Sequence, residues 1–141
     1  MQILSARLLR IEIIKPIKFS GIKQVEADWD VRPVFTIGNG SIPNTTLQYV
    51  DIEIIRQKSI RQATLTVRTV FEINLGNKDI KPETEQDFQA YTDFIQISAA
   101  HARALFQREV RGSIFGNDIL PFEFSTHATI KLKAGLSINN N

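Results

Sequence analysis

The sequence contains no cysteine, which excludes a disulfide framework, a thiolate zinc site and a cysteine nucleophile. Histidine is scarce, and the two present are too few for a metal centre built from histidine. Long apolar runs are also missing: charged residues interrupt Met1–Phe19, and no stretch approaches the ~20 apolar residues that cross a bilayer. We therefore expect a soluble, cytoplasmic protein with no membrane insertion and no bound metal.

Neither sign of charge is in large excess. The 141 residues carry a formal net charge of +2, and 43% of them are hydrophobic. This balance is typical of a globular domain and does not predict nucleic-acid binding. The chain has the length of one domain, with no internal repeat and no linker-like segment. We expect a single domain over residues 1–136, followed by a polar tail at 137–141.

Hydrophobic and polar residues alternate along several stretches, which is the pattern of strands with one buried face. No helical pattern separates these stretches, so we expect consecutive strands to pair antiparallel. Pro33 cannot donate a backbone hydrogen bond and should mark a bend, an edge strand or a split strand. The alternating stretches are 9–19 (irregular around Pro16), 25–37, 50–54 and 63–75.

Helical patterns follow these strands. Pro82, with acidic residues in the next turns, predicts a short helix that ends near Tyr91. Ser98 is the expected N-cap of a longer helix that ends before Gly112. The apolar stripe of this second helix consists of Ile95, Ala99, Ala102, Phe106 and Val110. Alternation returns over Phe122–Leu132, which predicts a final strand. The predicted class is α+β, an antiparallel sheet of four or more strands with two helices packed on one face.

Residues that could carry chemistry do not converge. Gly38-Asn39-Gly40 precedes no helical pattern, so it lacks the helix N-terminus that binds the phosphates of a dinucleotide. His101 and His127 have no partner at a spacing typical of catalysis or metal binding. We predict that the protein is not an enzyme and uses no cofactor.

One short segment is acidic, since five of the 15 acidic residues lie within residues 79–93. Glu83, Glu85 and Asp87 fall at the predicted start of the first helix, where carboxylates favour the helix dipole. Two interpretations stay open: a solvated helix start, or an acidic docking patch for a basic partner.

Apolar residues occupy both faces of some predicted strands. Val34, Ile55 and Val70 each lie beside an inward-facing apolar neighbour. A sheet with helices on one face should leave the other face polar unless something covers it. This pattern favours oligomerisation or a hydrophobic binding surface. The alternative is a rolled sheet that buries both faces within one chain.

Three parts of the sequence, and the order of the elements, resemble the SecB family of bacterial export chaperones. One is the Trp-containing alternating strand, another is a pair of long amphipathic strands, and the third is a helix with an Ala-Arg pair followed by a Leu-Pro-containing segment. The corresponding residues are Asp28–Ile37, Tyr49–Gln57 with Ala63–Leu75, and Ala100–Gly112 with Ile119–Phe124.

The resemblance implies ATP-independent binding of unfolded or extended polypeptides in a hydrophobic groove, serving protein export. It implies assembly as a homo-oligomer, a dimer or tetramer, and docking to a translocation motor. Carried over to this sequence, the groove residues would be Phe35, Ile37, Leu65 and Val67. On this assignment, Phe35→Asp should weaken client binding and leave the domain folded. Two alternatives remain: a dedicated partner, such as an assembly factor or antitoxin-type regulator for one client, and a small-molecule-binding α+β domain.

Overall fold

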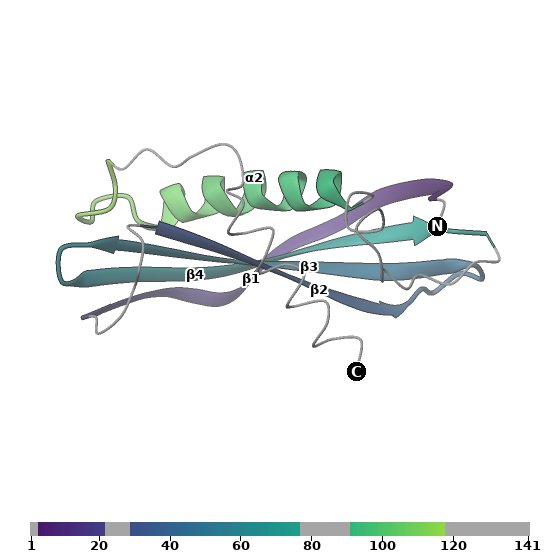
Figure 1. Cartoon of the computed structure of the whole chain (residues 1–141), viewed down its shortest axis with the longest axis horizontal. Helices are drawn as coiled ribbons and strands as arrows, with labels where there is room; N and C mark the ends of the chain where they lie inside the picture. The colour runs from purple at the N-terminus through teal and green to yellow at the C-terminus, as the bar shows by residue number, and fades with distance from the viewer. Residues whose placement is uncertain (1–2, 22–28, 77–90, 118–141) are drawn as a thin grey trace.

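The computed structural model describes residues 3–21, 29–76 and 91–117 of the chain. Four long strands and one helix make up this part (Figure 1). Their bounds are β1 Ser5–Gly21, β2 Trp29–Asn39, β3 Thr45–Lys58, β4 Arg61–Asn74 and α2 Thr92–Glu109.

The strands form one antiparallel sheet in the order β1-β4-β3-β2. This arrangement confirms the α+β class and the antiparallel sheet. One helix, not two, lies among the described residues. The first predicted helix falls mostly on 82–90 and, like the final strand and the polar tail, lies outside the residues that the structure describes. Within the described ranges, no helix is long and apolar enough to cross a bilayer.

Turn residues fix the register of the central strands. Ser59, with a φ of 58°, and Ile60 link β3 to β4 in a short hairpin. Gly40 lies against Thr45 in the loop between β2 and β3, and a Cβ at this glycine would meet the Thr45 carbonyl oxygen at 2.5 Å. Pro33 pairs with Ile52 in β2, which is an outer strand among the described strands, the position at which a sheet tolerates proline.

Helix α2 covers one face of the sheet and packs chiefly on the central strands β3 and β4 (Figure 1). Its predicted apolar stripe is confirmed, because all five of its residues are buried. The predicted N-cap is wrong: the helix begins at Thr92, six residues before Ser98, because Phe94 and Ile95 are also buried against the sheet. The Ser98 hydroxyl donates instead to the Phe94 carbonyl at 2.6 Å, as an interior residue does.

The hydrophobic core lies between this helix and the sheet. At the N-terminal end of α2, aromatic rings connect β2 to β4: Phe35 contacts Tyr91 at 4.9 Å, and Phe71 contacts Phe94 at 4.7 Å between ring centroids. Tyr91 and Phe94 contact each other at 5.6 Å. The buried sheet residues of this core are Val31, Phe35, Val50, Ile52, Ile54, Ala63, Leu65, Val67, Phe71 and Ile73.

The opposite face of the sheet is mainly polar. Arg32 pairs with Asp30 at 3.0 Å and with Glu53 at 3.5 Å, while Arg7 pairs with Glu72 at 3.0 Å. A second exposed apolar face, one of the two interpretations of the sequence, is not found here. Ile55 and Val70 are buried and Val34 is half-buried.

Candidate functional site

Three of the four residues assigned to a client groove lie in the core. Phe35 is 1% exposed, and Leu65 and Val67 are equally inaccessible on the side of the sheet that faces α2. Ile37 is half-buried at the edge of this core. A client could contact the three buried side chains only if the helix moved away. The acidic residues Glu83, Glu85 and Asp87 lie outside the residues that the structure describes.

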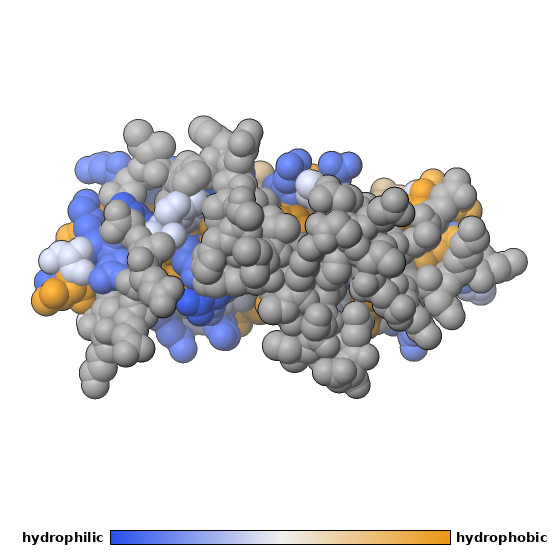
Figure 2. Space-filling view, viewed as in Figure 1, coloured by the Kyte–Doolittle hydropathy of each residue, from blue (hydrophilic) through white to orange (hydrophobic). Residues whose placement is uncertain are grey.

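The exposed hydrophobic surface lies on β1 instead. Ten large hydrophobic residues are exposed in the described part of the chain, and six of them belong to β1 or directly precede it. In Figure 2, hydrophobic side chains gather at the end of the molecule where β1 begins. The six residues are Leu4, Leu8, Leu9, Ile11, Ile14 and Phe19. This concentration on one element makes β1 the candidate site.

β1 is also an edge strand. It pairs with β4 on one side, and no described strand pairs with its other side. The N–H and C=O groups on that outer edge form a template on which another extended chain can add as a strand. The other edge strand, β2, differs because several of its side chains are buried. Backbone groups and apolar side chains are therefore exposed together on β1 and not on β2.

Irregular pairing explains how β1 exposes so many apolar residues. Its register with β4 shifts between Leu8 and Arg10, between Ile13 and Lys15, and again before Lys18. A bulge inserts an extra residue, which changes the direction of the side chains around it. Leu9 and Ile14 are the residues inserted at the first two shifts. In a regular strand, one residue of each doublet, Leu8-Leu9 and Ile13-Ile14, would lie on the polar face of the sheet.

A groove of about 490 Å³ separates β1 from α2. On the helix side, the lining residues recur at intervals of three and four, so they share one face of α2. The lining residues are Ile11, Glu12, Ile13, His101, Ala104, Leu105 and Arg108. The groove therefore runs beside the open edge and presents apolar side chains from both walls with charged groups among them.

His101 gives this groove an unused polar group. Its Nδ1 atom is buried and has no hydrogen-bond partner. Buried polar atoms are nearly always paired in native proteins, so this unpaired nitrogen is unusual among the residues that line the groove. Arg108, from the same wall, pairs with its neighbour Glu109 at 3.1 Å on the exposed helix surface. The Arg108 guanidinium is exposed and can donate hydrogen bonds to a polypeptide backbone that enters the groove.

Metal-binding geometry is not found in the described ranges. No group of three or more histidine, aspartate or glutamate side chains there could hold a metal ion. Burial lowers the pKa of Arg103, although a guanidinium stays protonated at neutral pH in any case. The outer edge of β1, with the groove beside it, is suited to contact with another extended chain.

The edge position of β1 is the feature that the sequence interpretation missed. The local signals were the doublets Leu8-Leu9 and Ile13-Ile14, which break strict alternation within an otherwise amphipathic strand. Adjacent apolar residues in a strand predict either a bulge or a face that something else covers. Only the order of the strands in the sheet shows which of these two explanations applies to β1.

No protein-family model matches the chain, and no curated protein matches it. Among solved structures, a protein of unknown function from Streptococcus agalactiae is similar with a TM-score of 0.57 and 10% identity, over 88% of this chain and 100% of that chain. The SecB-like chaperone of Mycobacterium tuberculosis, solved with a peptide from the HigA1 antitoxin, is weakly similar: the TM-score is 0.46 at 13% identity, over 74% of this chain and 78% of that chain. The similarity to the streptococcal protein shows a shared fold and does not identify a function.

Proposed function

We propose that this protein is a non-enzymatic binding protein that holds extended segments of other polypeptides along β1, without ATP. The observation that carries this proposal is the combination found on β1. A strand edge of 17 residues, Ser5–Gly21, which pairs with no further strand of the described ranges, exposes apolar side chains along its length and borders an apolar groove.

Each component supplies a different part of the recognition. Backbone hydrogen bonds from the β1 edge are independent of the client's sequence, because every residue except proline offers the same donor and acceptor. The groove beside Ile11 and Leu105 accepts apolar side chains, each worth about 1.5–3 kcal/mol when fully buried. Apolar burial is non-directional, so many sequences can use the same groove. The proposed substrate class is therefore an extended chain with apolar residues, as an unfolded protein exposes.

The test uses reduced, carboxymethylated α-lactalbumin as a permanently unfolded probe and native α-lactalbumin as its folded counterpart. We expect the protein to bind the unfolded form in isothermal titration calorimetry, with or without ATP, and not the folded form. The double variant Leu9→Lys with Ile11→Lys should weaken this binding at least tenfold, because charged side chains on an edge strand oppose strand addition.

Ile97→Lys is the matched control, since Ile97 is an exposed isoleucine of α2 that lines neither described pocket. It introduces the same kind of substitution away from β1, with one added charge where the double variant has two, and should bind the probe as the unmodified chain does. Circular dichroism should show all variants folded, because surface substitutions usually change stability by less than about 0.5 kcal/mol. Equal loss of binding in the β1 double variant and the Ile97 control would contradict the proposal.

Light scattering on the same samples separates this function from its competitors. A second copy of the chain could pair with β1, so a stable dimer that the β1 double variant dissociates, with no binding of the probe, would assign the edge to self-assembly. The dedicated-partner alternative predicts no binding of unrelated unfolded proteins and stoichiometric binding of one folded protein. A role in export, with docking to a translocation motor, stays a prediction of the sequence.

A further inference from the structure

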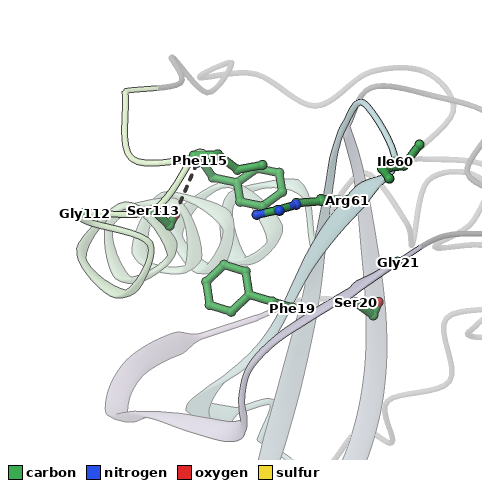
Figure 3. A pocket seen from close by; sticks show the side chains of 9 residues that line it. Phe19, Ser20, Gly21, Ile60, Arg61, Gly112, Ser113 and Phe115 are labelled. Carbon is green, nitrogen blue, oxygen red and sulfur yellow. Dashed lines mark hydrogen bonds between the residues drawn. The ribbon is translucent and has the colours of Figure 1, made fainter.

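A second pocket lies at the end of the molecule where β1 stops and the β3–β4 hairpin turns (Figure 3). Its volume is about 620 Å³, within the range of roughly 300–1,000 Å³ typical of small-molecule sites. Three segments far apart in the sequence build it. They are Phe19–Gly21 at the end of β1, Ile60 and Arg61 at the hairpin, and Gly112–Phe115 after α2.

The wall of the pocket is aromatic and aliphatic. The rings of Phe19 and Phe115 are 6.0 Å apart between centroids and inclined by 25°. Phe115 is buried, whereas Phe19 is 54% exposed, and the two isoleucines at the rim, Ile60 and Ile114, are 76% and 42% exposed. Large apolar side chains that converge on one concave surface mark a binding site, unlike apolar residues scattered singly.

Hydrogen bonds hold this wall in place. The Lys58 ammonium donates to the Ile114 carbonyl at 2.9 Å and so ties the hairpin to the turn after α2. Within that turn, the Ser113 hydroxyl donates to the Val110 carbonyl at 2.6 Å and accepts from the Phe115 N–H at 3.1 Å. The pocket is therefore preformed, so little conformational entropy is lost when a ligand binds in it.

Among the described residues that line the pocket, Arg61 alone is charged. Figure 3 shows its side chain extending towards Phe115 and Phe19. Its guanidinium forms no ion pair or hydrogen bond with the described residues, although five donors are available. Lys58 and Lys18 add positive charge at the same end of the sheet, and no lining residue is acidic. An anionic group next to an apolar body complements this surface.

We propose that the pocket binds a small apolar carboxylate, an aryl- or alkylcarboxylic acid whose hydrocarbon part packs on Phe19 and Phe115. The carboxylate accepts paired hydrogen bonds from Arg61, the geometry that a guanidinium fork favours. The pocket shares Phe19–Gly21 with the end of β1 but none of the residues of the groove beside Ile11, and this inference does not depend on polypeptide binding along β1.

The experiment titrates the full chain with phenylbutyrate and records two-dimensional amide NMR spectra. We expect shifts confined to residues 19–21, 60–61 and 112–115. Phenylbutanol and phenylbutylamine, which keep the hydrocarbon and change the charge, should bind at least tenfold more weakly. Arg61→Gln should weaken phenylbutyrate binding about tenfold, the factor that corresponds to a loss of 1.4 kcal/mol. Phe19→Ala should weaken all three probes.

Lys18→Gln is the control for general electrostatics, because it removes the same charge from β1 without altering the pocket lining. It should leave phenylbutyrate binding within twofold of the unmodified chain, and thermal unfolding should show all variants folded. Equal binding of acid and alcohol, equal effects of the Arg61 and Lys18 variants, or shifts centred elsewhere would each overturn the proposal. Stronger binding of N-acetyl-leucyl-phenylalanine than of phenylbutyrate would also overturn it and assign the pocket to a peptide C-terminus. If the unfolded-protein assay fails and these results hold, the polypeptide proposal alone is lost.

Discussion

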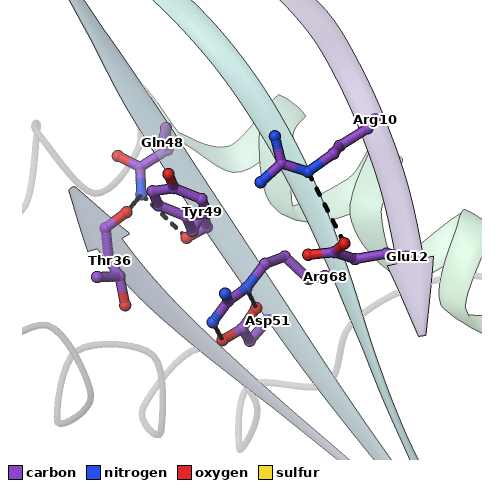
Figure 4. A network of polar contacts seen from close by, with 7 residues as sticks. All are labelled: Arg10, Glu12, Thr36, Gln48, Tyr49, Asp51 and Arg68. Atoms are coloured by element: carbon purple, nitrogen blue, oxygen red, sulfur yellow. Dashed lines mark hydrogen bonds and ion pairs between the residues drawn. The ribbon is translucent and has the colours of Figure 1, made fainter. Parts of the chain in front are cut away.

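Arg68 and Asp51 form a two-point ion pair across the centre of the sheet, on the face away from α2 (Figure 4). The guanidinium Nε and Nη2 atoms donate to the two carboxylate oxygens at 2.7 and 2.8 Å, and the two residues are direct register partners of β4 and β3. Arg68 also lies 5.1 Å from the ring centre of Tyr49. The hydrogen bonds to Asp51 raise the pKa of Arg68 above its ordinary value, which favours the charged form of the guanidinium.

Asp51→Asn should destabilise the fold by about 1–2 kcal/mol, because a charge-assisted pair at a partly buried position loses its carboxylate. Urea unfolding measures this difference. Arg7→Gln is the comparison: its pair with Glu72 has one contact and Arg7 is largely exposed, so its loss should cost less than about 0.5 kcal/mol. Equal costs for the two variants would show that the two-point geometry contributes nothing.

Phe35→Ala should destabilise the protein by about 3–5 kcal/mol, because this buried ring contacts Tyr91 and its removal leaves a cavity. Phe35→Asp should prevent folding, since a carboxylate would replace the ring in the core. This expectation differs from the folded variant that the chaperone resemblance implies. Circular dichroism and urea unfolding decide between them. Phe19→Ala, at an exposed ring, should stay within about 1 kcal/mol of the unmodified chain.

Ser98→Ala should leave stability unchanged or raise it by up to about 0.5 kcal/mol. Ser98 is an interior helical residue whose hydroxyl bonds the carbonyl four residues earlier, and alanine has the higher helix propensity. An N-cap serine would instead lose about 1 kcal/mol on the same substitution. Thermal unfolding distinguishes the two signs, and a clear loss of stability would contradict the helix start at Thr92.

Gly40→Ala should destabilise the loop between β2 and β3 by about 1–3 kcal/mol, because the added Cβ would meet Thr45 backbone atoms at 2.5 and 2.7 Å. Gly21→Ala is the control, since the nearest atom to its Cβ would be the Ile60 carbonyl oxygen at 3.9 Å. Hydrogen exchange at the β2–β3 end of the sheet should rise in the Gly40 variant only. Similar protection from hydrogen exchange in the Gly40 and Gly21 variants would contradict the close approach of Gly40 to Thr45.

The sequence predicts the strands and the apolar stripe of the helix well, because the spacing of apolar residues along one strand or helix follows the face that is buried. Ala63–Leu75 alternates except at Val70, and its odd positions are buried on the side of the helix. The same pattern could not say what covers that face. Phe35 and Val67 were assigned to an open groove, whereas the structure places α2 over this face. Periodicity identifies an apolar face, and only tertiary packing identifies its partner.

The two candidate sites could not be predicted for a different reason. The groove depends on β1 being outermost, which follows from the strand order and not from any residue of β1. The pocket at the hairpin end joins residues that lie about forty to ninety positions apart in the sequence. The local signal for it was Ile60, a large apolar residue at a turn. Contacts between such distant segments leave no periodic signal in the sequence.

The three register shifts of β1 divide its outer edge into the short regular blocks Ser5–Leu8, Arg10–Ile13 and Lys18–Gly21. Stacked fibrils are built from flat strands in continuous register, and bulges bend and twist the strand that carries them. We therefore expect the irregular edge of β1 to oppose the stacking of many copies of this strand into a fibril.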